Sequence, residues 1–588
     1  FPAPPPQGTT PDDAARPLPI LIEKILGTNE KLPPAWSIDG STGYDFLGAM
    51  RGVFVDPAAE RAITEQHRSF THDLRTYGDH VRESKDVVLR FSLASEVHML
   101  ATELEAIASR SRRFSDFTRM TLTRALVEVI AAFPVYRTYL AEEDGAASAE
   151  DRRYISAAVA TAAKRDTTLA PDVLRFIEDV LLMRIHGSDA DVVACRAFAA
   201  RFQQITGPVM AKSVEDTAFY RYSRLLCRND VGCDPSRFAV LPAELHAQSA
   251  ERARSWPLAM TTTSTHDSKL GEDAALRIAV ISEIPTVWRR ALAAFAHLVE
   301  PFKTVVSGEL APSRRDEWTF HQWVLAIWPF GWDGRGDRDA VAARLVEGMR
   351  KATKEAKLDT SWTNPSVDYD AALARFVREA LASEAYVEEM RRLAARIEKT
   401  AASHALSQTL VKVASPGIPD TYGGSERWNQ SLVDPDNRRP VDHVASRAML
   451  ARFRDVTDAP AFARSLLDEV HSGAAKMWVT QRALRARRER RELFLRGDYE
   501  PLADVARVLA FARTYKSEAA IALASRLVDP LTQAGARWPI GDAWGDERVE
   551  IASGRYRDAL TDRVFDVEDH ILVRDAFASL PVALLFRE

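Results

Sequence analysis

One stretch decides the fold prediction: Leu258-Ala-Met-Thr-Thr-Thr-Ser-Thr-His-Asp-Ser-Lys269. Its first seven residues, Leu258 to Ser264, are apolar or carry small hydroxyl groups, and this composition favours a short strand. His266 and Asp267 follow at once, among further hydroxyl side chains. Polar residues just past the C-terminal ends of parallel strands are where α/β barrels place catalysis. We therefore expect an α/β fold with a functional site directly after this strand.

Two further apolar runs are predicted as strands. Pro19-Ile-Leu-Ile-Glu-Lys-Ile-Leu26 stops at Gly27 and carries one carboxylate, and Thr409-Leu-Val-Lys-Val-Ala414 runs into Pro-Gly-Ile-Pro-Asp-Thr-Tyr-Gly-Gly424. The segments between these runs, roughly 57–203 and 273–410, have helical patterns. In the first of them one predicted helix face carries Leu93, Val97, Leu100 and Leu104.

The end of the chain has a different pattern. From about Glu500 the apolar periodicity becomes mixed and shorter. The runs 519–525 and 570–574 read as strands, which predicts a terminal β-domain.

Composition narrows the possible functions. The chain has 588 residues, of which 46% are hydrophobic and 27% charged, as in an ordinary soluble globular protein. Its net charge of −5 provides no general attraction to nucleic acid or to anionic lipid. No apolar run reaches the roughly 18 residues of a membrane span. We therefore expect no nucleic-acid partner and no membrane partner.

The cysteines and the start of the chain lead to further expectations. Cys195, Cys227 and Cys233 lack the spacing of a disulfide framework or a zinc site, which suits a reducing cytoplasm. The chain begins at Phe1 in a Pro-rich stretch that has no signal-peptide pattern. It therefore reads as part of a longer polypeptide.

Glu23 lies within an apolar strand candidate. Burying its carboxylate would cost several kcal/mol unless the group is paired or protonated. A raised pKa is what a general acid for glycoside cleavage needs. The alternative is a carboxylate at the strand end that faces solvent or pairs with Lys24.

His266 and Asp267 also allow two interpretations. Side by side after a strand, an imidazole and a carboxylate suit holding sugar hydroxyls or stabilising an oxocarbenium-like transition state. The alternative is helix capping, because Asp267 or Ser268 precedes a helical run.

Two other segments combine charges with groups that suit a sugar. Lys212-Ser-Val-Glu-Asp-Thr-Ala-Phe-Tyr-Arg-Tyr222 provides aromatic faces for pyranose stacking and charges for hydroxyls, or else forms an amphipathic helix with buried Phe219 and Tyr222. Asp434-Pro-Asp-Asn-Arg-Arg-Pro-Val-Asp442 is either a rigid frame for sugar hydroxyls or a structural ion-pair loop. Trp362 and Trp428, in polar loops, are candidates for sugar stacking.

The order of these motifs and the residues in them resemble those of the malto-oligosyltrehalose synthases, a family of α-amylase-like enzymes. The resemblance extends over roughly Pro19 to Arg488. It is carried by Ile22-Glu-Lys-Ile-Leu-Gly27, Asp39-Gly-Ser-Thr-Gly-Tyr-Asp-Phe46, Phe54-Val-Asp-Pro57, Lys212 to Tyr222, Ser264-Thr-His-Asp-Ser-Lys269, Gly271-Glu-Asp273, Thr360-Ser-Trp-Thr-Asn-Pro365, Pro416 to Gly424 and Ser431 to Asp442. The run Glu-Asp-Thr-Ala-Phe-Tyr-Arg-Tyr is peculiar to this family.

The resemblance implies a fold. It is the C-terminal part of a (β/α)8 TIM barrel with large helical insertions and a C-terminal β-sandwich domain. On that pattern 1–56 hold the fifth strand, 57–250 a helical insertion, 251–275 the seventh strand and 276–405 a second insertion. Residues 406–490 then hold the eighth strand and the last helices, and 491–588 form the β-domain. No residues are assigned to the sixth strand.

The resemblance also implies a reaction. The reducing-end α-1,4 linkage of a maltooligosaccharide would become an α,α-1,1 linkage by a retaining mechanism, with no cofactor and no metal. Glu23 matches the acid/base and Asp267 the carboxylate that stabilises the distorted ring. The implied substrate-binding residues are His266, Lys212, Glu215, Asp216, Phe219, Tyr220, Tyr222, Lys269, Trp362, Tyr422, Asp434, Asp436, Arg438 and Arg439. Departures from the family pattern, which concern fine specificity, are Ser268, Leu270, Asp230 and Cys233.

The nucleophilic Asp belongs in a Gly-x-Arg-x-Asp-His motif before the acid/base strand, and these residues contain no copy of it. Half a barrel would also have open strand edges. We therefore expect a second polypeptide to supply the first strands and the nucleophile. The resemblance also implies malto-oligosyltrehalose trehalohydrolase as the partner in the same pathway. The alternatives are a glucan-binding amylase relative without catalysis, or another α-amylase-like hydrolase or transglycosylase.

Overall fold

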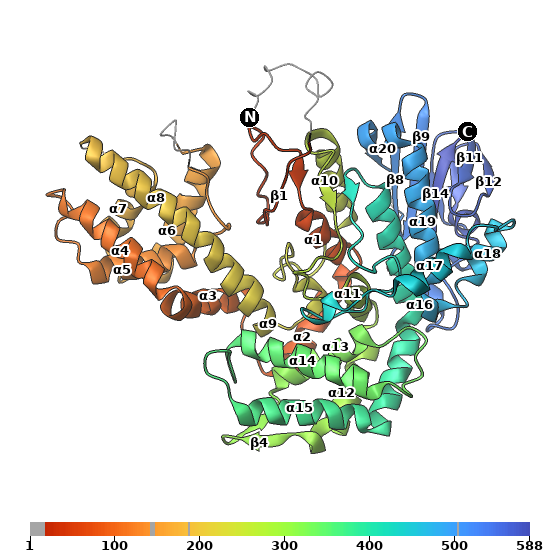
Figure 1. Ribbon diagram of the computed structural model, residues 1–588, viewed down its shortest axis with the longest axis horizontal. Helices are drawn as coiled ribbons and strands as arrows, with labels where there is room; N and C mark the ends of the chain where they lie inside the picture. Colours follow the sequence, from red (N-terminus) through yellow and green to blue (C-terminus); the bar gives the residue numbers. More distant parts are fainter. Residues whose placement is uncertain (1–17, 141–146, 186–187, 503–504) are drawn as a thin grey trace.

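The computed structural model describes residues 18–140, 147–185, 188–502 and 505–588, so the Pro-rich start of the chain lies outside the described residues. Helices make up most of the structure. Figure 1 shows a helical arm on one side, a central body, and a β-rich C-terminal region on the opposite side. None of the helices in the described ranges is both long and apolar enough for a bilayer span.

Four strands of two residues each lie in the central body. β1 (Leu21–Ile22) pairs in parallel with β2 (Gly40–Ser41), and β3 (Met260–Thr261) pairs in parallel with β6 (Ile418–Pro419). β2 lies against β3, because a Cβ at Gly40 would be 2.5 Å from the Cα of Ala259. The strands therefore lie in the order β1, β2, β3, β6. No apolar run marks β2, which is why no sequence pattern indicates it.

The strand predicted at Thr409–Ala414 is wrong. These residues are the last turns of α16 (Glu384–Ala414), and every residue from Thr400 to Ala414 is buried. A short apolar run does not distinguish a buried strand from a fully buried stretch of helix. The strand β6 begins only after the C-cap of the helix, Ser415, and after the chain has passed Pro416 and Gly417.

The helical arm has a hydrophobic core of its own. The predicted helix face is confirmed, because Val97, Leu100 and Leu104 are buried in this core and Leu93 packs against it. The helices from Tyr44 to Ser255 are α1 (Tyr44–Val53), α2 (Glu60–Thr71), α3 (Tyr77–Val87), α4 (Ala94–Ser109), α5 (Arg119–Ala131), α6 (Ala149–Arg165), α7 (Pro171–Leu181), α8 (Asp189–Met210), α9 (Phe219–Arg221) and α10 (Pro242–Ser255). Of these, α4 to α8 build the core of the arm, whereas α1, α2, α9 and α10 contribute to the core of the central body.

A larger core joins the central body to α16 and to the C-terminal sheet. Its helices are α11 (Glu272–Ala279), α12 (Pro285–Val299), α13 (Arg314–Ile327), α14 (Arg338–Ala356), α15 (Val367–Ala382), α17 (His443–Ala451), α18 (Ala459–Ser465), α19 (Ala474–Glu489) and α20 (Arg491–Arg496). A hairpin of β4 (Thr304–Val306) and β5 (Glu309–Ala311) lies beside α15.

The C-terminal region contains an antiparallel sheet of six strands in the order β12-β11-β14-β9-β8-β7, and a separate pair, β10 with β13. The predicted strand at 519–525 is confirmed as β9, but the one at 570–574 is only half right, because the strand ends at Leu572. The elements are β7 (Asp498–Pro501), β8 (Val508–Tyr515), β9 (Glu518–Ser525), β10 (Arg548–Glu550), β11 (Gly554–Asp558), β12 (Val564–Val567), β13 (His570–Leu572), α21 (Val573–Ala576) and β14 (Val582–Arg587).

A buried carboxyl lies where the C-terminal sheet meets the central body. Glu283, at the end of η5 (Val280–Glu283), accepts a hydrogen bond of 2.8 Å from the backbone N–H of Asp529. Its other oxygen lies 3.3 Å from Nε2 of His404 on α16. Burial raises the pKa of Glu283 to about 8, and the charges of Asp529 and Asp56 act in the same direction.

Glu283→Gln is expected to stabilise the protein at alkaline pH. The folded protein retains a proton that the unfolded chain releases above about pH 4.3, so the free energy of unfolding falls as the pH rises towards about 8. Glutamine removes this dependence. Urea unfolding at about pH 5 and about pH 9 should therefore show a gain that is larger at the higher pH. Equal gains at both pH values, or the same gain in the exposed control Glu65→Gln, would contradict the prediction.

Candidate active site

Glu23 lies directly after β1, and its side chain is exposed. The predicted burial of Glu23 among apolar residues is wrong, because β1 ends at Ile22 and it is Lys24 that points into the protein. Lys24 is 7% exposed, and its ammonium lies 2.6 Å from Glu30. Glu23 thus corresponds to the alternative of a strand-end carboxylate facing solvent, where a ligand can reach it.

His266 and Asp267 lie in a tight turn after β3. The backbone N–H of Asp267 donates to Oγ1 of Thr265 at 3.1 Å, and the N–H of Thr265 donates to Oγ of Ser268 at 2.9 Å. His266 Nε2 lies 3.3 Å from Asp267 Oδ2, and about half of each side chain is exposed. The capping alternative is wrong, because α11 begins only at Glu272.

Tyr44 connects this turn to the end of β1. It is the first residue of α1, and its hydroxyl lies 3.3 Å from Oγ1 of Thr265. Burial raises the pKa of Tyr44 to about 12; the hydrogen bond with Thr265 opposes the increase, and the charges of Asp267 and Glu23 add to it. Charges act in this way only at short range. The charges of Glu23 and Asp267 therefore both act on the phenol of Tyr44.

The charged members of the Lys212–Tyr222 motif face the same region. They lie on the π-helical segment η3 (Ala211–Ala218), where Asp216 pairs with Lys212 at 2.9 Å and with Lys269 at 3.3 Å. Glu215 accepts a hydrogen bond from the hydroxyl of Tyr136. Burial raises the pKa of Glu215 to about 7, and the charge of Asp267 is among the further causes. The motif and the His266–Asp267 turn are thus electrostatically coupled.

The aromatic members of the motif are buried. Phe219, Tyr220 and Tyr222 are 3%, 8% and 7% exposed, and Tyr222 packs against Tyr77 with ring centroids 5.5 Å apart. Their burial favours the packing role over pyranose stacking.

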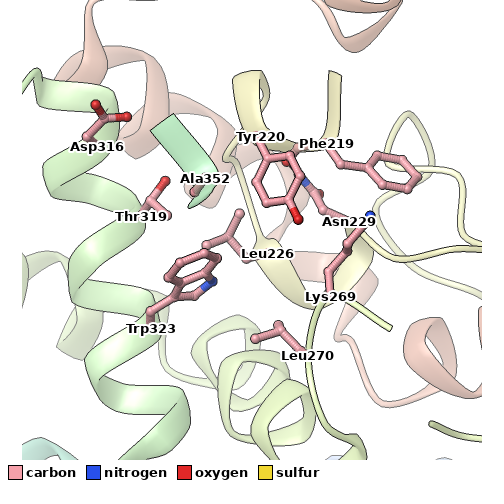
Figure 2. Close-up of a pocket in the computed structure, with 10 residues that line it drawn as sticks. All are labelled: Phe219, Tyr220, Leu226, Asn229, Lys269, Leu270, Asp316, Thr319, Trp323 and Ala352. Carbon is pink, nitrogen blue, oxygen red and sulfur yellow. The ribbon is translucent and has the colours of Figure 1, made fainter. Parts of the chain in front are cut away.

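Figure 2 shows Phe219, Tyr220 and Lys269 around a cavity of about 20 Å³, which has room for roughly one water molecule and not for a sugar ring. Two polar atoms in its wall, the hydroxyl of Tyr220 and Oδ1 of Asn229, form no hydrogen bond within the described residues. Such buried polar atoms normally have a hydrogen-bond partner.

The remaining aromatic candidates differ in exposure. Trp362 is 55% exposed and donates a 3.0 Å hydrogen bond to Glu355, so its ring is open to a ligand. Tyr422 is half-buried, and its hydroxyl donates to the carbonyl of Asn437. Trp428 donates to the carbonyl of Val470 and packs on Phe330, which favours a structural role.

The charged turn at 434–442 is built around a carboxylate that is only 8% exposed. Asp436 accepts two hydrogen bonds from Arg344, at 2.8 and 2.9 Å, and one from the backbone N–H of Leu432. Arg439 also contacts Asp436 at 3.0 Å, and Arg438 pairs with Asp434 at 2.6 Å. These contacts favour the structural ion-pair loop.

Asn437, in the middle of that turn, is a residue that sequence reasoning missed. It lies in η7 (Asp436–Arg438), and its side-chain amide donates to the carbonyl oxygens of His266 at 3.0 Å and of Ser268 at 3.4 Å. The charged turn therefore supports the His266–Asp267 turn. No local signal reveals this contact, because the two segments are 171 residues apart.

Asn437→Ala is expected to loosen the His266–Asp267 turn. Losing hydrogen bonds worth about 1 kcal/mol should speed amide hydrogen exchange at 265–269 by roughly fivefold. Mass spectrometry of the peptide that spans this turn measures the rate. Arg438→Ala, in the same turn but without a bond to His266 or Ser268, is the control. Equal rates in the two variants would contradict the assignment.

No family model matches the chain. A Mycobacterium tuberculosis protein that carries the name maltooligosyl trehalose synthase is 32% identical over 572 residues, 97% of this chain and 65% of that protein. The solved structure of maltooligosyltrehalose synthase from Arthrobacter ramosus is 35% identical over 97% of this chain and 66% of its own, with a TM-score of 0.80. The chain belongs to the maltooligosyl trehalose synthase family.

Family membership confirms the predicted resemblance. A solved Sulfolobus tokodaii protein, 24% identical with a TM-score of 0.72, shares the fold. The synthase family fold is seen here as a mixed helical and stranded body with a β-rich C-terminal region. Because this family member spans 65–66% of the length of its relatives, the closed barrel, the domain boundaries and the β-sandwich stay predictions.

Behind the candidate site, the chain holds a buried group of charges. Glu272 and Asp273, at the start of α11, are each 1% exposed. Lys476 of α19 lies 2.6 Å from Glu272 and 2.7 Å from Asp273, and Lys412 of α16 lies 3.3 Å from Glu272. Although burial disfavours its charge, the two lysines hold the pKa of Glu272 at about 2. This group locks α11, α16 and α19 together beneath the turn.

Arg51 of α1 supports the same turn from its other side. The guanidinium, 1% exposed, donates to the carbonyl of Leu270 at 2.6 Å and pairs with Asp230 at 3.2 Å. Asp230 in turn accepts a 3.0 Å hydrogen bond from the backbone N–H of Lys269. The described residues contain no group of three His, Cys, Asp or Glu side chains arranged for a metal ion.

Proposed function

We propose that this chain carries the acid/base and a second essential carboxylate of an enzyme that makes trehalose ends on maltooligosaccharides. The reaction converts the reducing-end α-1,4 linkage into an α,α-1,1 linkage. The observation that carries the proposal is that hydrogen bonds connect the ends of the two strands that Glu23 and Asp267 follow. The N–H of Thr42 donates to the carbonyl of Ile22, and the hydroxyl of Tyr44 lies 3.3 Å from Oγ1 of Thr265, the oxygen that accepts the N–H of Asp267. Family membership supports the reaction class.

In this proposal Glu23 is the acid/base. An exposed carboxyl group at the end of β1 protonates the glycosidic oxygen as the terminal α-1,4 bond breaks. As a carboxylate it then accepts the proton of the anomeric hydroxyl of the released glucose. The oxygen of that hydroxyl forms the new bond to C1 of the glucan end as the bond between this C1 and the nucleophilic Asp breaks. The same group thus acts once as an acid and once as a base.

Asp267 and His266 hold the hydroxyls of the sugar that reacts. The negative charge of Asp267 stabilises the positive charge that develops on the ring in the transition state. The turn that carries it is tied down by Thr265 and Asn437, so little reorganisation is needed during the reaction.

We further propose that Lys212, Asp216, Glu215 and Lys269 hold the released glucose while it turns over. Their ion pairs and hydrogen bonds offer donors and acceptors at fixed places beside Asp267. Because the pKa of Glu215 is about 7, its carboxyl changes between donor and acceptor near neutral pH. Trp362, Tyr422, Asp434, Arg438 and Arg439 are proposed as outer contacts to the glucan.

A retaining reaction also needs a nucleophilic carboxylate about 5 Å from the acid/base. We propose that this Asp comes from the part of the family's length that these 588 residues do not span, whether joined to them or in a second polypeptide. The product ends in a trehalose unit without a reducing end. We expect malto-oligosyltrehalose trehalohydrolase to act on it next.

The test is to incubate the chain with maltopentaose, with and without a polypeptide that carries the Gly-x-Arg-x-Asp-His motif. The expected result, with that polypeptide present, is loss of reducing ends at unchanged mass. Free glucose would instead indicate a hydrolase, and a spread of chain lengths an intermolecular transglycosylase. Glucan binding without any conversion would favour the glucan-binding relative and end the proposal.

A further inference from the structure

Tyr44 is a buried residue for which the proposed chemistry has no task. It belongs to the Asp39–Phe46 motif, and its side chain is 3% exposed. Its hydroxyl nevertheless reaches Oγ1 of Thr265, the same oxygen that accepts the backbone N–H of Asp267. A continuous path of hydrogen bonds therefore connects α1 to the Asp267 main chain.

The backbone of Tyr44 is fixed on two sides by close approaches that require glycine. Gly43 has a φ of 91°, and a Cβ there would lie 2.5 Å from the carbonyl oxygen of Met260 in β3. A Cβ at Gly232, which has a φ of 84°, would collide with the carbonyl oxygen of Tyr44. Only glycine combines a positive φ with such close contact. The start of α1 is thus held against β3 and against residue 232.

The same region also includes the end of β1. β2, which ends two residues before Gly43, pairs with β1, and the backbone N–H of the intervening Thr42 donates to the carbonyl of Ile22 at 3.0 Å. Glu23 is the next residue after Ile22. Tyr44 therefore stands between the main chain that carries Glu23 and the turn that carries Asp267.

We propose that Tyr44 is a positioning residue: through Thr265, its hydroxyl holds the His266–Asp267 turn at a set place relative to Glu23. A phenol suits this task because it stays neutral beside carboxylates and keeps its proton to donate. Burial and the charges of Asp267 and Glu23 keep the pKa of Tyr44 far above neutral pH. The catalytic consequence of this role rests on the proposed function, whereas its effect on the turn does not.

The first test is Tyr44→Phe, which removes the hydroxyl and keeps the buried ring. We expect kcat for maltopentaose conversion to fall by about 10- to 100-fold, because a small displacement of a catalytic group is costly. KM should change less than about threefold, since the sugar-binding groups are untouched. Thr265→Val should have a similar effect, and Thr265→Ser, which retains the oxygen, should restore near-normal kcat.

The matched control is Tyr556→Phe. Tyr556 is 1% exposed, and its hydroxyl donates to the carbonyl of Ala552 at 2.8 Å in the C-terminal region. It should lose a comparable amount of stability with unchanged kcat. If Tyr44→Phe also retained kcat within twofold, or if the effects of Tyr44→Phe and Thr265→Val were additive, the proposal would be overturned.

A second measurement separates this proposal from the proposed function. If the wild-type protein converts no maltopentaose even with the polypeptide that carries the Gly-x-Arg-x-Asp-His motif present, the proposed function fails. Hydrogen exchange of the turn then tests the role of Tyr44 by itself. Tyr44→Phe should then speed amide exchange at 265–268 by roughly fivefold relative to Tyr556→Phe. Equal exchange in the two variants would show that the hydroxyl does not hold the turn.

Discussion

Asp267→Asn is expected to lower kcat for maltopentaose conversion by about 100- to 1,000-fold, because the amide cannot stabilise a developing positive charge. The side chain is about half exposed and contacts mainly His266, so folding stability should change little. Reducing-end loss under saturating maltopentaose measures kcat, and urea unfolding measures stability. Asp172→Asn, at an exposed carboxylate of α7, is the control.

The same variant tests the geometry without catalysis. The charge of Asp267 is one of the causes that raise the pKa of Tyr44, so removing it should lower that pKa. Titration of isotope-labelled tyrosine by NMR detects the shift in the chain alone. If Asp267→Asn kept more than about a tenth of the wild-type kcat, Asp267 would not have its proposed role in the mechanism. If the pKa of Tyr44 did not change, the carboxylate of Asp267 would lie too far from Tyr44 to act on it.

Lys476→Met is expected to destabilise the protein by about 3–5 kcal/mol at neutral pH, the cost of leaving buried charges without their partner. Lys476 is 0% exposed and is the ion-pair partner of both Glu272 and Asp273, so only Lys412 would remain beside the two carboxylates. Urea unfolding gives the loss. Arg485→Met, at an exposed ion pair on the same helix, should cost less than about 0.5 kcal/mol.

The pH dependence of this variant has a definite sign. Burial already raises the pKa of Asp273 to about 6, opposed by Lys476, and losing that lysine raises it further. A raised carboxyl pKa makes stability fall as the pH rises through it, so Lys476→Met should recover stability on acidification from about pH 7 to about pH 5. Adding Asp273→Asn removes the carboxylate that loses its lysine partner, whereas Glu272 keeps Lys412, so this second change should also recover part of the loss. A double variant less stable than Lys476→Met would contradict this account.

Local sequence patterns determined which side chains and which elements are available. The run ending at Ser264 predicts a strand followed by polar residues, and β3 with the His266–Asp267 turn lies there. The helix face of Val97, Leu100 and Leu104 and the strand β9 were likewise readable from periodicity. These features depend on neighbours within a few residues, which the order of the chain supplies.

Where local patterns are ambiguous, prediction failed. The apolar run Thr409–Ala414 suits a buried strand and the buried end of a helix equally well. In the structure it packs as the end of α16. The burial expected for Glu23 depended on how far β1 continues and on which neighbour turns inward. The residue that points inward is Lys24, and its ammonium forms an ion pair with Glu30. Neither outcome is encoded in the alternation of apolar residues alone.

The site is held together by contacts between segments that are far apart in the sequence. Tyr44 meets Thr265 across 221 residues, Asn437 meets His266 across 171, and Lys476 meets Glu272 across 204. The amino-acid sequence specifies the chemical groups of the site and, where its local pattern is clear, the strand that precedes them. Their separation and their supports arise from contacts between distant segments, which form only when the chain packs, and no local pattern of residues records them.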